Sequence, residues 1–334
     1  MEKDFDVTSN ASFIVYRIEM LNKIKAPRRF IYEYIELQKK VGKFPNELEF
    51  LSSFYDNKTG SSGSFFRNTK LDNYILAYTG TNFYFDREKD MYADVVGICL
   101  GQGEHYTPCY RFYKRMVKKY GDNVILTGHS LGGNIAQRVA LEYNVQETVV
   151  YNAAPLYLVD GIDIFMNKED DNLLYKERMT KYRRNINKIY KKQQKFTGCV
   201  KRIVSENDVF TRIAELLGIG YYIGDEYIIK EAGMHGIKSF LGVHQTTLSS
   251  LFGGEAEMSE YLSSEYKEFS LEEISLLRIF SKGIINSLEG QLKTTLKSQT
   301  MLNNLNKNPY KVNFEKFLTQ LLEKIEEQKQ EKLE

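Results

Sequence analysis

The sequence has few cysteines of the kind that cross-link small secreted domains, and it lacks the excess of positive charge that binds nucleic acid. It has three cysteines, Cys99, Cys109 and Cys199, which cannot all pair within one chain and show no Cys-x-x-Cys spacing. We therefore expect neither a disulfide framework nor a zinc knuckle. Lys plus Arg number 46 against 44 Asp plus Glu, a net charge of +2, so no overall positive field attracts nucleic acid.

Long apolar runs are also missing. No stretch approaches the roughly 18 apolar residues that indicate a transmembrane helix. The N-terminus carries charges at positions 2 to 4 and no uninterrupted apolar segment of the kind found in secretory signals. We therefore expect a soluble protein that is cytoplasmic, or that is exported by a route without a cleaved signal peptide.

Histidine is the scarcest residue type with catalytic potential. The chain has His105, His129, His235 and His244. A mechanism that needs an imidazole as a proton acceptor near neutral pH must therefore use one of these four side chains.

The order of apolar patterns predicts the fold class. The chain of 334 residues is 42% apolar, which is typical of a globular protein, and allows one large or two modest domains. In its middle, short apolar runs typical of buried strands alternate with runs whose apolar residues recur every three or four positions, as in helices. This alternation predicts an α/β fold with a mostly parallel sheet and helices on both faces. The predicted strands are residues 64–66, 74–78, 124–127, 148–152 and 199–204.

Three regions are expected along the chain. Residues 1–58 are predicted to form a helical segment that packs on the core, with a pattern that is helical to about residue 55 and is followed by a turn-rich run. Residues 59–254 are predicted to form the α/β domain. Residues 255–334 show helical patterns that end in a charged tail, and are predicted to form a C-terminal helical region.

A nucleophile motif lies between a predicted strand and a predicted helix. Gly128-His129-Ser130-Leu131-Gly132 fits the pattern Gly-x-Ser-x-Gly. A strand that reverses sharply into a helix strains the residue at the apex, so the positions two before and two after it must lack bulky side chains. The pattern therefore predicts that Ser130 projects from the carboxyl edge of the sheet, beside a helix N-terminus that favours developing negative charge.

A serine hydroxyl at its ordinary pKa needs an imidazole to accept its proton and an acid to orient that imidazole. In α/β-hydrolases the acid and the histidine follow the serine in chain order. This order excludes His105, and His129 is part of the motif itself. His235 and His244 remain, and we favour His244, which lies in a loop that turns into a helix, over His235 in the segment Ala232-Gly233-Met234-His235-Gly236.

The acid is expected at the end of a strand that follows the Ser130 helix. Asp208 comes just after the predicted strand 199–204 and is our first choice. Asp160 and Asp163, in an earlier loop, are weaker candidates, and Glu206 lies close enough to Asp208 to compete with it.

Two backbone donors are expected to stabilise the oxyanion of the reaction. One is the N–H of Leu131, the residue after the nucleophile. The other is expected from the loop that follows the strand 74–78, where Gly80 lets the backbone approach the reacting carbon. Thr81 is expected to contribute its N–H and its hydroxyl.

These motifs resemble the lipase class 3 family, in a bacterial branch of it. The resemblance runs from Tyr74 to Thr81, through Asp94-Val95, to the segment from Ile125 to Gly133, and covers about residues 60–252. Its specific part is the hexapeptide Gly-His-Ser-Leu-Gly-Gly at residues 128–133.

Three further positions of this sequence can be compared with the family's pattern. Ala154-Pro155 stand where the family has Gly-x-Pro, Asn207-Asp208 match the pair that supplies the triad acid, and Thr79 stands where the family usually has Arg. The resemblance implies an α/β-hydrolase fold, a Ser-Asp-His triad, hydrolysis of carboxylic esters of lipids, and no cofactor.

We therefore expect a lipase or phospholipase A in which Ser130 attacks the ester, His244 relays the proton, Asp208 orients His244, and Thr81 and Leu131 bind the oxyanion. One alternative is an esterase or thioesterase for a soluble acyl substrate. Another is an exported lipase effector or an idle scaffold whose helical ends bind a partner.

Two segments are candidates for further contacts. Residues 172–195 hold nine Lys or Arg against one acidic residue. They are expected to cover the site or dock on anionic phospholipid at a membrane surface, or to form a solvated helix that packs its apolar face on the core, and both can hold at once. The helices after residue 255 are candidates for binding a protein partner.

Overall fold

The computed structural model of the protein describes residues 4–80, 97–98, 100–159, 173–205, 208, 220–229 and 235–241. The predicted C-terminal region 255–334 lies outside these residues, as do the candidates Thr81 and His244. The candidate acids Asp160, Asp163 and Glu206 lie outside them as well.

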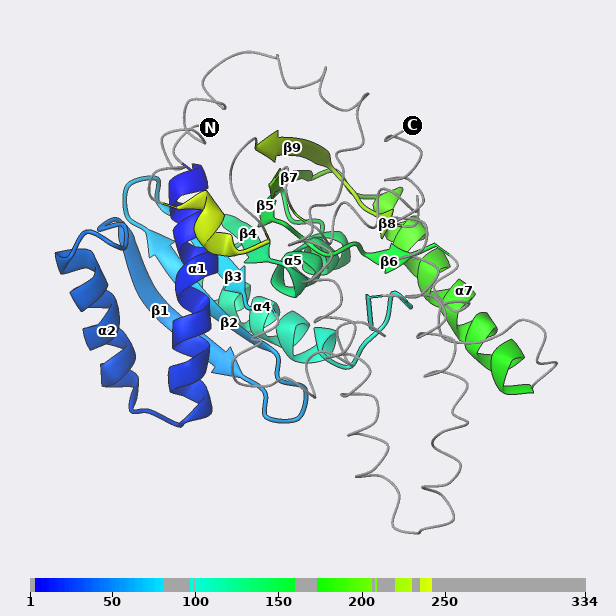
Figure 1. The fold of residues 1–334 in the computed structure, drawn as a ribbon, viewed down its shortest axis with the longest axis horizontal. Helices are drawn as coiled ribbons and strands as arrows, with labels where there is room; N and C mark the ends of the chain where they lie inside the picture. Colours follow the sequence, from blue (N-terminus) through cyan, green and yellow to red (C-terminus); the bar gives the residue numbers. More distant parts are fainter. Residues whose placement is uncertain are drawn as a thin grey trace, which may run out of the picture.

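A mostly parallel sheet forms the centre of the described structure (Figure 1). Its seven described strands have the order β1-β2-β3-β4-β5-β7-β9. The bounds are β1 (Leu48–Tyr55), β2 (Ser62–Asn68), β3 (Asn73–Tyr78), β4 (Val124–His129), β5 (Glu147–Tyr151), β7 (Cys199–Ser205) and β9 (Asp225–Ile229). The pairs β1-β2 and β2-β3 are antiparallel, and every pair from β3 to β9 is parallel. The predicted α/β class is confirmed.

Helices cover both faces of this sheet. On one face lie α1 (Asp4–Lys23), α2 (Arg28–Lys40) and the 3₁₀ helix η1 (Ile237–Phe240), and Figure 1 shows α1 crossing the strands beside η1. On the other face lie α4 (Tyr106–Tyr120) and α5 (Leu131–Tyr143), with α7 (Leu173–Gln193) against α5. A separate pair, β6 (Tyr157–Leu158) and β8 (Gly220–Tyr221), is antiparallel. Among the described helices, none has the length and apolarity to cross a membrane.

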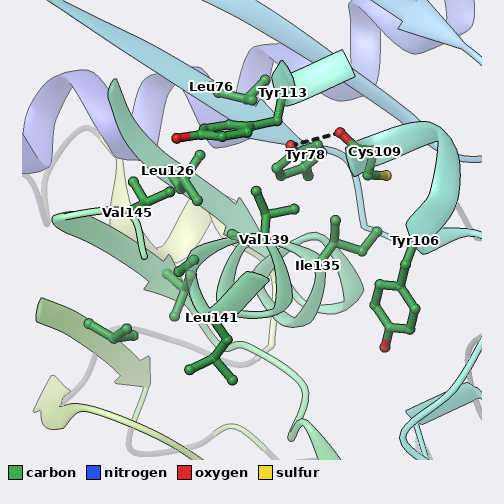
Figure 2. Close-up of a cluster of buried hydrophobic side chains, with 14 of the residues drawn as sticks. Leu76, Tyr78, Tyr106, Cys109, Tyr113, Leu126, Ile135, Val139, Leu141 and Val145 are labelled. Carbon is green, nitrogen blue, oxygen red and sulfur yellow. Dashed lines mark hydrogen bonds between the residues drawn. The ribbon is translucent and has the colours of Figure 1, made fainter. Parts of the chain in front are cut away.

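Strand alternation divides the core into two clusters. In β3, Leu76 and Tyr78 pack toward α4 and α5, whereas Ile75 and Ala77 pack toward α1. Figure 2 shows the first cluster, in which the Tyr78 hydroxyl donates to the carbonyl of Cys109 at 3.3 Å. Burial on both faces explains the almost continuous apolar run of this strand.

The N-terminal region departs from the predicted helix at its end. Residues 48–55 form the edge strand β1, which pairs with β2 across the turn-rich run. The expectation of helix to residue 55 is therefore wrong for this part. Leu48 and Phe50 are buried on one side of an exposed Glu49, a period-two signal too short to outweigh the helical pattern before it.

Glycines let α5 approach the sheet closely. A Cβ built on Gly132 would lie 2.3 Å from the carbonyl oxygen of Tyr78 and 2.9 Å from the amide nitrogen of Gly80. A Cβ on Gly128 would lie 2.3 Å from the backbone of Gly132. The two flanking glycines of the motif are therefore required by backbone contacts, as the sequence predicts.

Replacing Gly132 tests this packing. Because the added methyl group meets backbone rather than a movable side chain, we expect Gly132→Ala to lower the free energy of unfolding by about 3 kcal/mol or more, measured by urea denaturation. The matched control is Gly236→Ala, since Gly236 has φ −66° and, among the described residues, no atom within 4 Å of its built Cβ. We expect the control to change stability by less than about 0.5 kcal/mol. Equal losses for the two variants would contradict the argument.

Candidate active site

Ser130 occupies a strained apex between β4 and α5. Its φ of 57° and ψ of −124° lie in a region that side chains other than glycine rarely adopt. Its amide donates to the Tyr151 carbonyl at 3.1 Å, and its own carbonyl accepts from the amides of Gly133, Asn134 and Ala154. The neighbouring strand β5 and the first turn of α5 therefore hold the serine in this conformation.

Two side chains meet Ser130 at the carboxyl edge of the sheet. His235 Nε2 lies 2.9 Å from Ser130 Oγ, and His235 Nδ1 lies 2.8 Å from Asp208 Oδ1. Asp208 lies three residues after the end of β7 and is fully buried, while the His235 side chain is 17% exposed and comes after β9. Three parallel strands thus deliver a serine, a histidine and an acid in one hydrogen-bonded chain.

The chemistry of the acid sets the tautomer of this histidine. A carboxylate only accepts hydrogen bonds, so with Asp208 as carboxylate, His235 Nδ1 carries the proton and donates it. The lone pair on Nε2 then faces the Ser130 hydroxyl and accepts its proton in a hydrogen bond. This arrangement prepares the hydroxyl for removal of that proton during a nucleophilic attack.

The structure changes the assignment of the imidazole. The sequence favours His244 for the position between the serine and the acid, and His235 occupies that position. The position follows β9, a strand that is not among those predicted from the sequence, so the sequence does not connect His235 to the edge of the sheet. The apolar run Tyr227-Ile228-Ile229 in β9 was the available signal.

His129 and Asn152 fix the backbone of His235. The carbonyl oxygen of His235 accepts from His129 Nε2 at 2.7 Å and from Asn152 Nδ2 at 2.9 Å. Because His129 Nε2 donates, its Nδ1 accepts from the Tyr16 hydroxyl at 2.8 Å. Burial, and then the neighbouring His235, lower the pKa of His129 to about 3, so this imidazole is neutral near pH 7. His129 therefore positions the histidine of the site and carries no charge.

The backbone after β3 approaches the serine closely. A Cβ built on Gly80 would lie 3.3 Å from the Cβ of Ser130 and 2.4 Å from the carbonyl oxygen of His129. The start of this loop therefore lies beside the serine, and Thr81 itself lies outside the described residues. Leu131 begins α5, where the first amides have no acceptor within the helix. Its N–H is thus available to an anion beside Ser130.

Thr79 has polar partners where the resembling family usually has Arg. The Ser62 hydroxyl lies 2.5 Å from the Thr79 hydroxyl and 2.7 Å from Oε1 of Glu19 in α1. All three side chains are buried. Hydrogen bonds from β2 and α1 therefore support the start of this loop.

The remaining described histidine lies apart from this group. His105 is buried, and neither of its ring nitrogens has a hydrogen-bond partner among the described residues. Burial, with a smaller contribution from Arg138, lowers its pKa to about 4. Chain order excludes His105 as the imidazole that pairs with Ser130, and its position apart from Ser130 agrees with that exclusion. Within the described part of the chain, no cluster of three His, Cys, Asp or Glu side chains is arranged to hold a metal ion.

Residues 47–159 match the family model described as phospholipase-like, the Tle-like phospholipase domain. No curated protein matches the sequence significantly. Similar solved structures include lipase II from Rhizopus niveus, with 14% identity and a TM-score of 0.40 over 68% of this chain and 80% of that one. Rhizomucor miehei triacylglyceride lipase shows 12% identity and a TM-score of 0.43 over 68% and 79%.

The arrangement of elements is that of an α/β-hydrolase fold. The parallel strands β3 to β9 end at one edge, the serine lies at the turn from β4 into α5, and the acid and histidine follow later strands in that order. This topology confirms the fold expected from the sequence.

The low pKa of His129 predicts a pH dependence of stability. In the unfolded chain the ordinary pKa near 6.5 lets this side chain bind a proton that the folded state refuses down to about pH 3. Stability from this site is therefore complete above pH 6.5 and is lost as the pH falls, by about 1.4 kcal/mol per pH unit.

His129→Gln tests this, because the amide can still donate to the His235 carbonyl but does not titrate. Urea denaturation between about pH 7 and pH 4 measures both proteins. On acidification below pH 6.5, we expect the wild type to lose about 1.4 kcal/mol more stability per pH unit than the variant does. Parallel curves for the two proteins would refute the prediction.

Proposed function

We propose that this protein is a serine hydrolase that cleaves carboxylic esters of lipids. The observation that carries the proposal is the hydrogen-bonded chain from Ser130 through His235 to Asp208, set at a strained turn in front of a helix N-terminus. A strained serine with an imidazole within hydrogen-bond reach, itself oriented by a buried carboxylate, is the constellation that acyl transfer requires.

The first half of the reaction forms an acyl-enzyme. Ser130 Oγ attacks the ester carbonyl carbon while His235 Nε2 takes the hydroxyl proton. Asp208 stabilises the resulting imidazolium, and the N–H of Leu131 donates to the oxyanion of the tetrahedral intermediate. The intermediate collapses as the ester C–O bond breaks, and His235 returns the proton to the departing alcohol.

The second half releases the acid. His235 takes a proton from a water molecule, whose oxygen attacks the acyl carbon of the Ser130 ester. The tetrahedral intermediate is stabilised by the same donors and collapses with return of the proton to Ser130 Oγ. Thr81 is proposed as the second oxyanion donor, supported by the close approach of Gly80 to Ser130.

The match of residues 47–159 to a phospholipase-like family model supports a lipid substrate. Between a lipase and a phospholipase A, this match favours the phospholipase. The region after residue 255 remains a proposed site for a protein partner. An esterase or thioesterase for soluble acyl groups would use the same three side chains, so substrate length is the property that separates the two activities.

The assay uses the purified chain with phosphatidylcholine and phosphatidylglycerol vesicles, triacylglycerol emulsions, and nitrophenyl esters and acyl thioesters of graded length. We expect release of fatty acid and lysophospholipid, and faster turnover of long acyl chains than of short ones. A preference for short soluble esters would favour the alternative activity. No turnover of any ester by the wild type would overturn the proposal.

Variants of the three side chains test the mechanism. Ser130→Ala and His235→Ala each remove an essential step, so we expect each to lower kcat by at least about a thousandfold. His244→Ala is the matched control and is expected to retain turnover. Loss of turnover in His244→Ala with full activity in His235→Ala would reverse the assignment of the base. Thermal unfolding of each variant checks that it is folded.

A further inference from the structure

We propose that a pocket between α4, α5 and α7 binds a phosphate group, carried by a phospholipid headgroup or by a small soluble phosphate ester. The pocket has a volume of about 290 Å³ and is lined from three helices and the loop before α4. Tyr106 and Leu141, two of its lining residues, are labelled in Figure 2 on α4 and α5. Its charged side chains are Arg138, Lys188, Lys192 and Glu142.

Arg138 provides the main recognition group. Its guanidinium carbon lies 4.8 Å from the centroid of the Tyr106 ring, which holds the planar group against α4. Its Nη1 atom is buried and has no hydrogen-bond partner among the described residues. A buried guanidinium N–H without an acceptor is costly, and a phosphate oxygen is the acceptor that best matches its planar fork.

Two lysines of α7 bring further positive charge to the same pocket. Lys192 donates to the carboxylate of Glu142, which neutralises one of the three cations. Lys188 has no ion pair with a described residue. Burial, and then the nearby Arg138, lower the pKa of Lys192. Like charges thus converge here with one carboxylate among them, and a bound anion would relieve their repulsion.

The shape and polarity of the pocket favour phosphate over a simple carboxylate. Cationic groups approach from α5 and α7, two different sides, as the tetrahedral oxygens of a phosphate require. Thr107 and Asn185 add a hydroxyl and an amide to the lining. The volume exceeds that of the phosphate alone and leaves room for a small group such as glycerol.

This pocket is distinct from the proposed catalytic centre. Arg138 follows Ser130 by eight residues, about 12 Å along the axis of α5. The inference therefore does not depend on the proposed reaction. It identifies a binding site on the helical layer beside the sheet.

The surface of α7 favours a phospholipid as the source of the phosphate. The helix exposes six cationic side chains and a single acidic one, Glu177, among its residues from 175 to 193. The exposed cations are Lys176, Lys181, Arg183, Arg184, Lys188 and Lys191. Such a face is attracted to anionic lipid, and the buried Tyr182 and Ile189 anchor the opposite face to the protein. Both earlier expectations for this segment, packing and docking, are compatible with this arrangement.

The first experiment measures soluble phosphate binding to the full chain by calorimetry, with glycerol 3-phosphate as ligand and glycerol as the uncharged control. We expect millimolar or tighter binding of the phosphate, and at least about tenfold weaker binding by Arg138→Gln and by Lys188→Gln. The matched control is Lys191→Gln, which removes the same charge from an exposed position of α7 outside the pocket lining. It is expected to bind like the wild type.

The second experiment measures cosedimentation with vesicles of phosphatidylcholine, with or without phosphatidylglycerol. It uses the Ser130→Ala background, so that the lipid is not consumed and failure of the proposed reaction does not affect the result. A larger loss of binding for Arg138→Gln than for Lys191→Gln identifies the lipid headgroup as ligand. Vesicle binding indifferent to Arg138, together with Arg138-dependent binding of glycerol 3-phosphate, identifies a soluble phosphate ester.

The inference is overturned if neither probe distinguishes Arg138→Gln and Lys188→Gln from Lys191→Gln. It is also overturned if the wild type binds neither glycerol 3-phosphate nor the vesicles. Thermal unfolding in the absence of ligand shows whether each variant is folded, and Lys188→Gln changes an exposed side chain whose loss does not disturb the core.

Discussion

The strained backbone of Ser130 is the constraint on which the site depends. The backbone strain of a serine with φ of 57° costs about 1–3 kcal/mol of conformational free energy, which contacts with the surrounding structure must offset. Backbone hydrogen bonds from β5, from the segment after it and from the first turn of α5 offset this strain. At Gly132 the first turn of α5 also lies close against the backbone of β3. The glycines on either side of the serine therefore serve one requirement: the chain must reverse here without side chains in the way.

Parallel strands then determine where the partners of the serine can lie. Ser130, Asp208 and His235 follow β4, β7 and β9, whose carboxyl ends meet at one edge of the sheet. The His235 ring does not depend on its own short segment for its position. Its carbonyl is held by His129 from β4 and by Asn152 at the end of β5, while its ring is held by Asp208. The ends of three strands, β4, β5 and β7, therefore share in placing one imidazole.

Features with a local signal could be predicted from the sequence, and features that depend on distant pairing could not. The turn at Ser130, the buried strands around it and the position of Asp208 follow from spacing within a few residues. His235 and His244 both satisfy chain order, and the choice between them depends on β9, which pairs with β7 from another part of the chain. The sequence does not predict the edge strand β1 for the same reason. Its pairing with β2 outweighs the helical pattern of the residues before it.

The first helix contributes more to the site than a cover for the core. Three of its polar side chains have partners on the strands or loops near the site. Ser12 bonds to Thr127 in β4, Tyr16 donates to His129, and Glu19 reaches Ser62 beside the loop of Gly80. A helix that served only to bury apolar area would place apolar residues at these positions, because each buried polar group needs a matched partner to offset its desolvation. This helix precedes residue 47, where the phospholipase-like match begins. The support of the proposed catalytic groups therefore extends into a segment that the family match does not cover.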